Sequence, residues 1–174
     1  AATTQVAKDS LFAVKGDLRE MLAGIVKIGR PAEKLRALQM AVGDDRISDA
    51  DEAALAELAL DVGLHTSASD ADSRAWLRAL RVLAAGLLRD RSSQKASPLL
   101  IENLDMTIME ADRGLADKGA LLEAIASLGT LGTHEAAVRL TQYLVQLNSY
   151  TEKGKGYDEQ VVGAVIENLG RLAD

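Results

Sequence analysis

Arginines recur at helical spacing in one stretch of the chain, and their chemistry makes that stretch a candidate binding surface. Arg74, Arg78 and Arg81, with Arg89 further on, fall along one side of a helix expected over residues 70–90. Planar guanidinium groups pair with carboxylates and phosphates through two parallel hydrogen bonds. This stripe could therefore meet a carboxylate-rich partner or a phosphate chain. The alternative is an ordinary solvated helix face with acidic neighbours.

A second candidate surface combines tyrosines and lysines. Tyrosine offers a large contact area and a polar hydroxyl at low entropic cost, so three of them in a chain with few aromatics favour binding. The segment "EKGKGYDE" lacks the strand, spacing and hydroxyl residue of a phosphate-binding loop, and we expect a long linker over residues 148–157. The alternative is that the tyrosines only pin this linker to the helices. The residues concerned are Tyr143, Tyr150, Tyr157, Lys153 and Lys155.

Candidate catalytic and metal-binding residues are few. "VGDDRISDAD" resembles the second half of a calcium-binding loop, but the first two ligand positions fall on Met40 and Val42, which cannot bind a hard cation. His65 and His134 stand apart from any nucleophile and carboxylate in a recognisable order, and there is no cysteine. We therefore expect a protein that is not an enzyme and that has no cofactor and no metal.

The composition restricts the possible partners. The 174 residues carry a formal net charge of −6, which disfavours broad attraction to nucleic acid or anionic membranes. No apolar run is long enough to span a bilayer. The small residues of "AATTQVAKDS" fit what remains after removal of a signal or anchor, which favours an exported or periplasmic protein over a cytoplasmic one. An arbitrary boundary would give the same start.

The apolar spacing predicts an all-α protein. Aromatic residues make up only 3% of the chain, two prolines occur, and the apolar residues recur at helical rather than alternating positions, with Trp76 in the expected core. Helices are predicted over 17–29, 31–42, 48–63, 70–90 and 97–114, and apolar stripes over 121–131, 138–147 and 161–172.

One sequence motif recurs near the end of the chain. "SLGTLGTHEA" is echoed by "NLGRLAD", which places Gly129 and Gly170 in equivalent positions. The stretch "IASLGTLGTHEAAVRLTQYL" resembles a HEAT repeat of the bacterial, PBS-lyase-like kind, most clearly over residues 120–174. The resemblance implies a right-handed α-α superhelix of antiparallel helix pairs that acts as a scaffold for another protein. Some proteins resembling this family act on bound chromophores, so a lyase or a ligand-binding protein is an alternative, as is a nucleic-acid binder that uses the arginines.

The repeat pattern also bears on domain organisation. We expect a single helical repeat domain over residues 1–174. "NLGRLAD" stops where a second helix should begin, which leaves the stripe over 161–172 without its own partner and favours a fragment of a longer repeat protein over a capping helix. Irregular spacing of the earlier copies leaves open a helical bundle over residues 1–115 joined to a short HEAT-like end.

Overall fold

The protein is all-α, as the apolar spacing predicts. The computed structural model describes residues 18–173 apart from 92, 155 and 157, and within those residues it contains helices and no strand. The α-helices are α2 (Leu18–Ile28), α3 (Pro31–Ala41), α4 (Asp49–His65), α5 (Ala71–Asp90), α6 (Ser97–Asp112), α7 (Lys118–Leu131), α8 (His134–Glu152) and α9 (Glu159–Ala173), and a 3₁₀ turn, η2 (Gln94–Ala96), precedes α6.

Polar side chains fix where several helices begin. Ser48, Asp70, Asp117 and Thr133 each precede a helix in extended conformation, and each side chain accepts a hydrogen bond from the backbone N–H three residues later. Each bond satisfies one of the amides that a helix start leaves without a partner. The helix boundaries are therefore encoded largely by local sequence.

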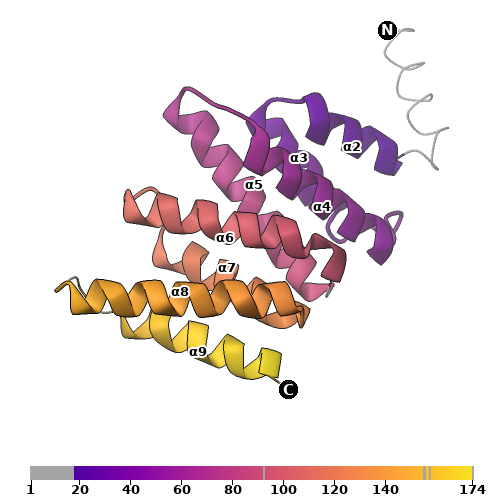
Figure 1. The fold of residues 1–174 in the computed structure, drawn as a ribbon. Coiled ribbons are helices and arrows are strands. Elements are labelled where there is room, and N and C mark those ends of the chain that lie inside the picture. The colour runs from indigo at the N-terminus through magenta and orange to yellow at the C-terminus, as the bar shows by residue number, and fades with distance from the viewer. Residues whose placement is uncertain (1–17, 92, 155, 157, 174) are drawn as a thin grey trace, which may run out of the picture.

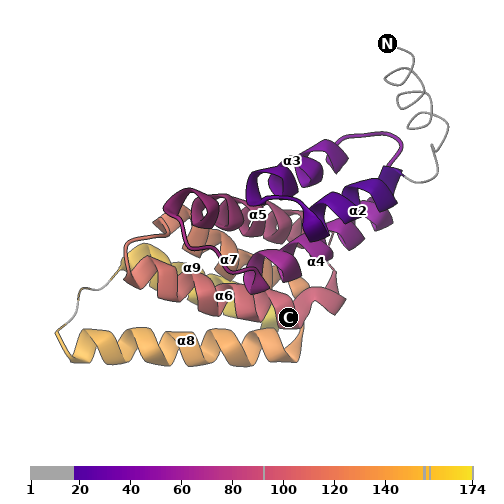
Figure 2. The same cartoon turned by 90° about the horizontal axis from the view of Figure 1, so that it is seen from above.

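The helices form two layers (Figures 1 and 2). Helices α2, α4, α6 and α8 follow one another in one layer, and α3, α5, α7 and α9 in the other. Contacts across the layers join α2 to α3, α4 to α5, α6 to α7 and α8 to α9. The result is a row of four helix pairs, in which each pair buries its apolar face against the next.

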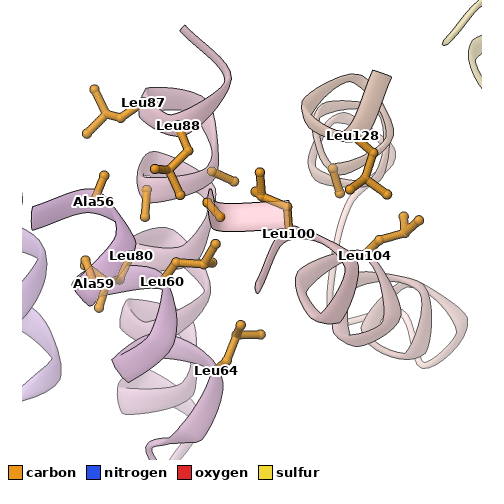
Figure 3. Packing of buried hydrophobic residues seen from close by; sticks show 14 of the residues in the cluster. Ala56, Ala59, Leu60, Leu64, Leu80, Leu87, Leu88, Leu100, Leu104 and Leu128 are labelled. Carbon is orange, nitrogen blue, oxygen red and sulfur yellow. The ribbon is translucent and has the colours of Figure 1, made fainter. Parts of the chain in front are cut away.

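Leucine and alanine fill the space between the layers. Figure 3 shows Leu60 and Leu64 of α4 facing Leu80 of α5, with Leu100 and Leu104 of α6 next in the row. Alanines such as Ala56, Ala59 and Ala84 are fully buried, which allows helix backbones to approach closely. These side chains belong to one continuous core that extends from α2 to α9.

The last helix packs against two preceding helices, which cover part of the stripe over 161–172, whereas Ile166 is 55% exposed. Val161 and Val165 are buried, and α9 packs against both α7 and α8. Helix α7 in turn contacts α6 and α9 more extensively than α8. Helix α8 therefore packs more extensively against α9 than against α7, the helix with which the repeat resemblance had paired it.

Three local expectations need correction. Trp76 is 45% exposed and lies at the surface of α5 instead of in the core. Helix α4 continues through Gly63, the expected stop, to His65. Helix α8 continues to Glu152, so the linker expected from residue 148 is shorter; Gly154, with φ of 77°, marks the turn that follows the helix.

Candidate binding site: an arginine pocket

The three arginines of the predicted stripe line a pocket. The pocket has a volume of about 190 Å³ and lies between the N-terminal half of α5, the C-terminal half of α6 and the segments that follow α4 and α6. We call it the arginine pocket. Its principal lining residues are Arg74, Arg78, Arg81, Arg113, Glu110, Met106, Met109 and Leu115.

A buried ion pair forms the floor of the arginine pocket. Glu110 of α6 is 5% exposed and Arg81 of α5 is 7% exposed; the Arg81 Nη2 group donates to Oε1 of Glu110. Arg81 Nη1 donates to the carbonyl oxygen of Gly63 at 3.0 Å, and Arg78 Nη1 donates to Glu110 Oε2 at 3.2 Å. The carboxylate therefore holds two guanidinium groups in fixed positions.

Gly63 leaves the space through which the Arg81 side chain reaches Glu110. A Cβ atom on Gly63 would lie 2.8 Å from Cγ of Arg81, closer than side-chain atoms normally approach. Burial lowers the pKa of Arg81 and the attraction of Glu110 opposes that shift, so the guanidinium remains protonated. The glycine thus has a packing role inside α4, not the helix-ending role expected from the sequence.

Two further arginines stand at the rim of the arginine pocket. Arg74 Nη1 donates to the carbonyl oxygen of Ser69 at 2.6 Å, which ties the arginine to the segment after α4. Arg113 caps α6 and is exposed, and no ion pair holds its side chain among the residues that the structure describes. Gly114, with φ of 72°, turns the chain so that the Leu115 N–H reaches the Glu110 carbonyl at 2.8 Å, which brings Leu115 to the rim.

Charge and size limit what the arginine pocket can hold. Four guanidinium groups and one carboxylate line it, so positive charge is in excess in a chain whose net charge is −6. Met106, Met109 and Leu115 add apolar wall, and two of them, Met109 and Leu115, are exposed. Typical cofactor pockets run from about 300 to 1,000 Å³, so this one fits a single acidic side chain with its apolar neighbours.

The structure brings together all three arginines predicted in the stripe, but they are not a solvated face. Arg81 is buried, Arg78 is half-buried and Arg74 is exposed, whereas Arg89 lies apart and pairs with Glu123 of α7 at 2.9 Å. Sequence reasoning missed Arg113 and Glu110, because both come from another helix. The one available signal was that Glu110 interrupts the apolar positions of α6.

The structure describes three of the five residues of the tyrosine and lysine surface. Tyr143 is 3% exposed and packs in the core, which supports the packing alternative for that residue. Tyr150 lies within α8, where its hydroxyl group accepts a hydrogen bond from Gln146. Lys153 caps the end of α8 and is exposed. Lys155 and Tyr157 lie outside the described residues.

His65, which the sequence shows in no recognisable order with a nucleophile and a carboxylate, lies between two carboxylates in the structure. Its Nδ1 lies 2.8 Å from Asp61 on α4 and its Nε2 lies 2.6 Å from Glu102 on α6. The histidine thereby bridges consecutive helices of one layer, and within the described residues no nucleophile is hydrogen-bonded to any of these three side chains. Over residues 18–173, gaps excepted, no cluster of three His, Cys, Asp or Glu side chains is placed to hold a metal ion.

Comparison with known proteins identifies no relative of this chain. No protein-family model matches the chain, and no curated protein or solved structure matches it. Within the described residues, none of the helices combines the length and apolar character that crossing a membrane requires.

Proposed function

We propose that the chain is a helical-repeat interaction module that binds an acidic segment of a partner protein at the arginine pocket. The excess of guanidinium groups around a small, partly apolar pocket is the observation that carries this proposal. The row of helix pairs supports a solenoid of the HEAT-like class, to which the repeat resemblance also points. A right-handed superhelix is part of the same proposal.

The ion pair at the floor supports binding rather than catalysis. Glu110 already holds Arg78 and Arg81, so the pocket presents prepositioned guanidinium groups and no carboxylate free to act as a base. An acidic side chain that enters between Arg74 and Arg113 would meet charged donors, while an adjacent leucine or methionine could contact Met109 and Leu115. An amphipathic acidic segment therefore matches both parts of the lining.

Nucleic acid matches the surroundings of the arginine pocket less well. Helices α4 and α6, which lie beside the arginine pocket, expose four carboxylates: Asp61, Glu102, Asp105 and Asp112. A continuous phosphate backbone would have to pass these carboxylates, whereas a short peptide can place one acidic residue in the pocket. A partner protein is therefore the proposed ligand, and nucleic acid is an outcome of the test.

The test uses a fluorescent peptide of alternating glutamate and leucine, with its glutamine analogue as the uncharged control. Fluorescence anisotropy should show binding of the acidic peptide alone. Arg113→Gln and Arg74→Gln should each weaken it by about tenfold, the value of one hydrogen bond to a charged group. Arg36→Gln, on the exposed side of α3, makes the same charge change outside the pocket and should leave the affinity unchanged.

Three results would overturn the proposal. Equal affinities for the glutamate and glutamine peptides would show that charge does not drive binding. Equal losses of peptide affinity in Arg113→Gln and Arg36→Gln would show that the peptide does not bind at the arginine pocket. Tighter binding of a single-stranded oligonucleotide, with a steep dependence on salt, would assign the arginines to nucleic acid instead.

A further inference from the structure

A second depression lies between α5 and α7 and has the opposite charge. It is an open groove of about 590 Å³. Its α5 wall is formed by Val82, Leu83, Gly86, Leu87 and Asp90, and its α7 side by Asp117, Gly119, Ala120 and Glu123. We call it the acidic groove.

Small side chains keep the acidic groove open. Gly86 and Gly119 place no side chain in it and Ala120 places only a methyl group, so the depression runs between two adjacent helices of one layer. Val82 is exposed and Leu83 is half-buried, which leaves an apolar floor in contact with solvent. The α5 wall from Val82 to Asp90 is about 12 Å long at 1.5 Å per residue, the length of about two helical turns.

Carboxylates line the acidic groove and no basic residue does. Asp90, Asp117 and Glu123 are its only charged lining residues in the described part of the chain. Of the neighbouring cations, Arg89 pairs with Glu123 at 2.9 Å and with Asp90 at 3.5 Å, and Lys118 turns away to Asp158 at 3.0 Å. Asp90 and Asp117 are exposed, so negative charge remains at both ends of the apolar floor.

We infer that the acidic groove docks a basic amphipathic helix of a partner protein. The apolar floor takes leucine-like side chains at helical spacing, and lysine or arginine on either side of that stripe meets Asp90 and Asp117. The walls are helices and not strands, so they offer no sheet edge to an extended peptide. A helical ligand satisfies its own backbone and needs only side-chain contacts. This inference stands independently of the function proposed for the arginine pocket.

The test uses a synthetic helix of about 18 residues, long enough to be partly helical alone. It carries leucine at positions i, i+4 and i+7 and lysine on both flanks. One control peptide has the same composition with the leucine spacing scrambled, and another has glutamate in place of lysine. Fluorescence anisotropy should show binding of the first peptide alone.

Substitutions locate the binding surface. Gly86→Leu fills the acidic groove and should weaken binding by tenfold or more, whereas Gly163→Leu, at an exposed glycine of α9 with open space around it, should not. Asp90→Lys should weaken binding severalfold, while Asp45→Lys makes the same charge change in the segment between α3 and α4 and should have little effect. Arg113→Gln, in the arginine pocket, should also leave this peptide bound.

Other results would overturn the inference. Equal binding of the scrambled peptide would show attraction to net charge alone, and unchanged affinity for Gly86→Leu would place the peptide elsewhere. If Gly86→Leu does not fold, amide chemical shifts of the wild-type protein decide the matter. Peptide-induced changes must then concentrate in residues 82–90 and 117–123, and changes confined to other helices would contradict the inference.

Discussion

The side chain of Asn168 on α9 occupies the space that a Cβ atom on Gly129 of α7 would need. A Cβ built on Gly129 would overlap the Asn168 side chain, and Asn168 is itself buried. Its Nδ2 donates to the Ala164 carbonyl at 2.8 Å, while its Oδ1 has no hydrogen-bond partner among the described residues. Gly129 therefore sets how closely α7 and α9 approach.

Gly129→Ala should destabilise the protein by about 1–3 kcal/mol, the usual cost of forcing extra atoms into a packed interface. Gly170→Ala is the matched control, because Gly170 has open space around it and alanine favours the helix by roughly 0.5–1 kcal/mol. Urea unfolding measures both changes. The double variant Gly129→Ala with Asn168→Ala should recover part of the loss, and equal effects at the two glycines would contradict this account.

Glu110→Ala should destabilise the protein by about 3–5 kcal/mol, because it leaves the Arg81 guanidinium buried without its carboxylate. Asp112→Ala on the same helix removes an exposed carboxylate and should change stability by less than about 0.5 kcal/mol. Replacing both Glu110 and Arg81 by methionine should restore much of the loss. A small effect of Glu110→Ala in thermal or urea unfolding would show that the ion pair contributes little.

His65 should make stability depend on pH. The hydrogen bond to Glu102, and then that to Asp61, raises the pKa of His65 above its ordinary value of 6.5. The favourable contacts of the protonated ring are fully present below the unfolded pKa and are lost as the pH rises through the folded pKa. The difference in Tm between wild type and His65→Gln should therefore be larger well below pH 6.5 than well above it.

An NMR titration of His65 checks the cause of that dependence. Glu102→Gln should lower the pKa of His65, because Glu102 makes the largest contribution to raising it. Glu57→Gln, on α4 but away from the histidine, serves as the charge control. An unchanged His65 pKa in Glu102→Gln would show that the bridge between α4 and α6 does not form in solution.

Tyr143 should ionise only at unusually high pH. Burial, followed by the charges of Asp112 and Tyr150, raises the pKa of Tyr143 to about 12. Spectrophotometric titration should show a phenolate step near that value that is absent in Tyr143→Phe. Tyr143→Ala should cost about 3–5 kcal/mol, as for other large buried rings. Ionisation at the ordinary tyrosine value would place the ring in solvent.

The helices could be predicted because their signals are local. Ser48, Asp70 and Thr133 cap helices at positions recognisable from a few residues of sequence. The extent of α8 was misjudged because polar Asn148 and Ser149 resembled a linker, although the left-handed turn comes only at Gly154. The apolar spacing therefore predicted which segments are helical more reliably than it predicted where each helix ends.

The candidate site was harder to predict because its parts come from separate helices. In the sequence Arg81 continues the stripe from Arg74, yet it is four residues after buried Leu77 and three before buried Ala84, on the inward face of α5. Its partner Glu110 lies on α6. Only the packing of α4, α5 and α6 converts a row of arginines into a pocket with a buried carboxylate beneath it.

The two-layer row has a mechanical consequence. Helices α2 to α9 make their principal contacts with helices one or two places away in the chain. Strain or loosening at α2 can therefore reach α9 only through the helix pairs that lie between them. Hydrogen exchange should consequently vary by region along the row, and tightening around the arginine pocket should slow exchange most in α4, α5 and α6. A bound ligand should therefore stabilise the helix pairs that it contacts before it affects more distant pairs.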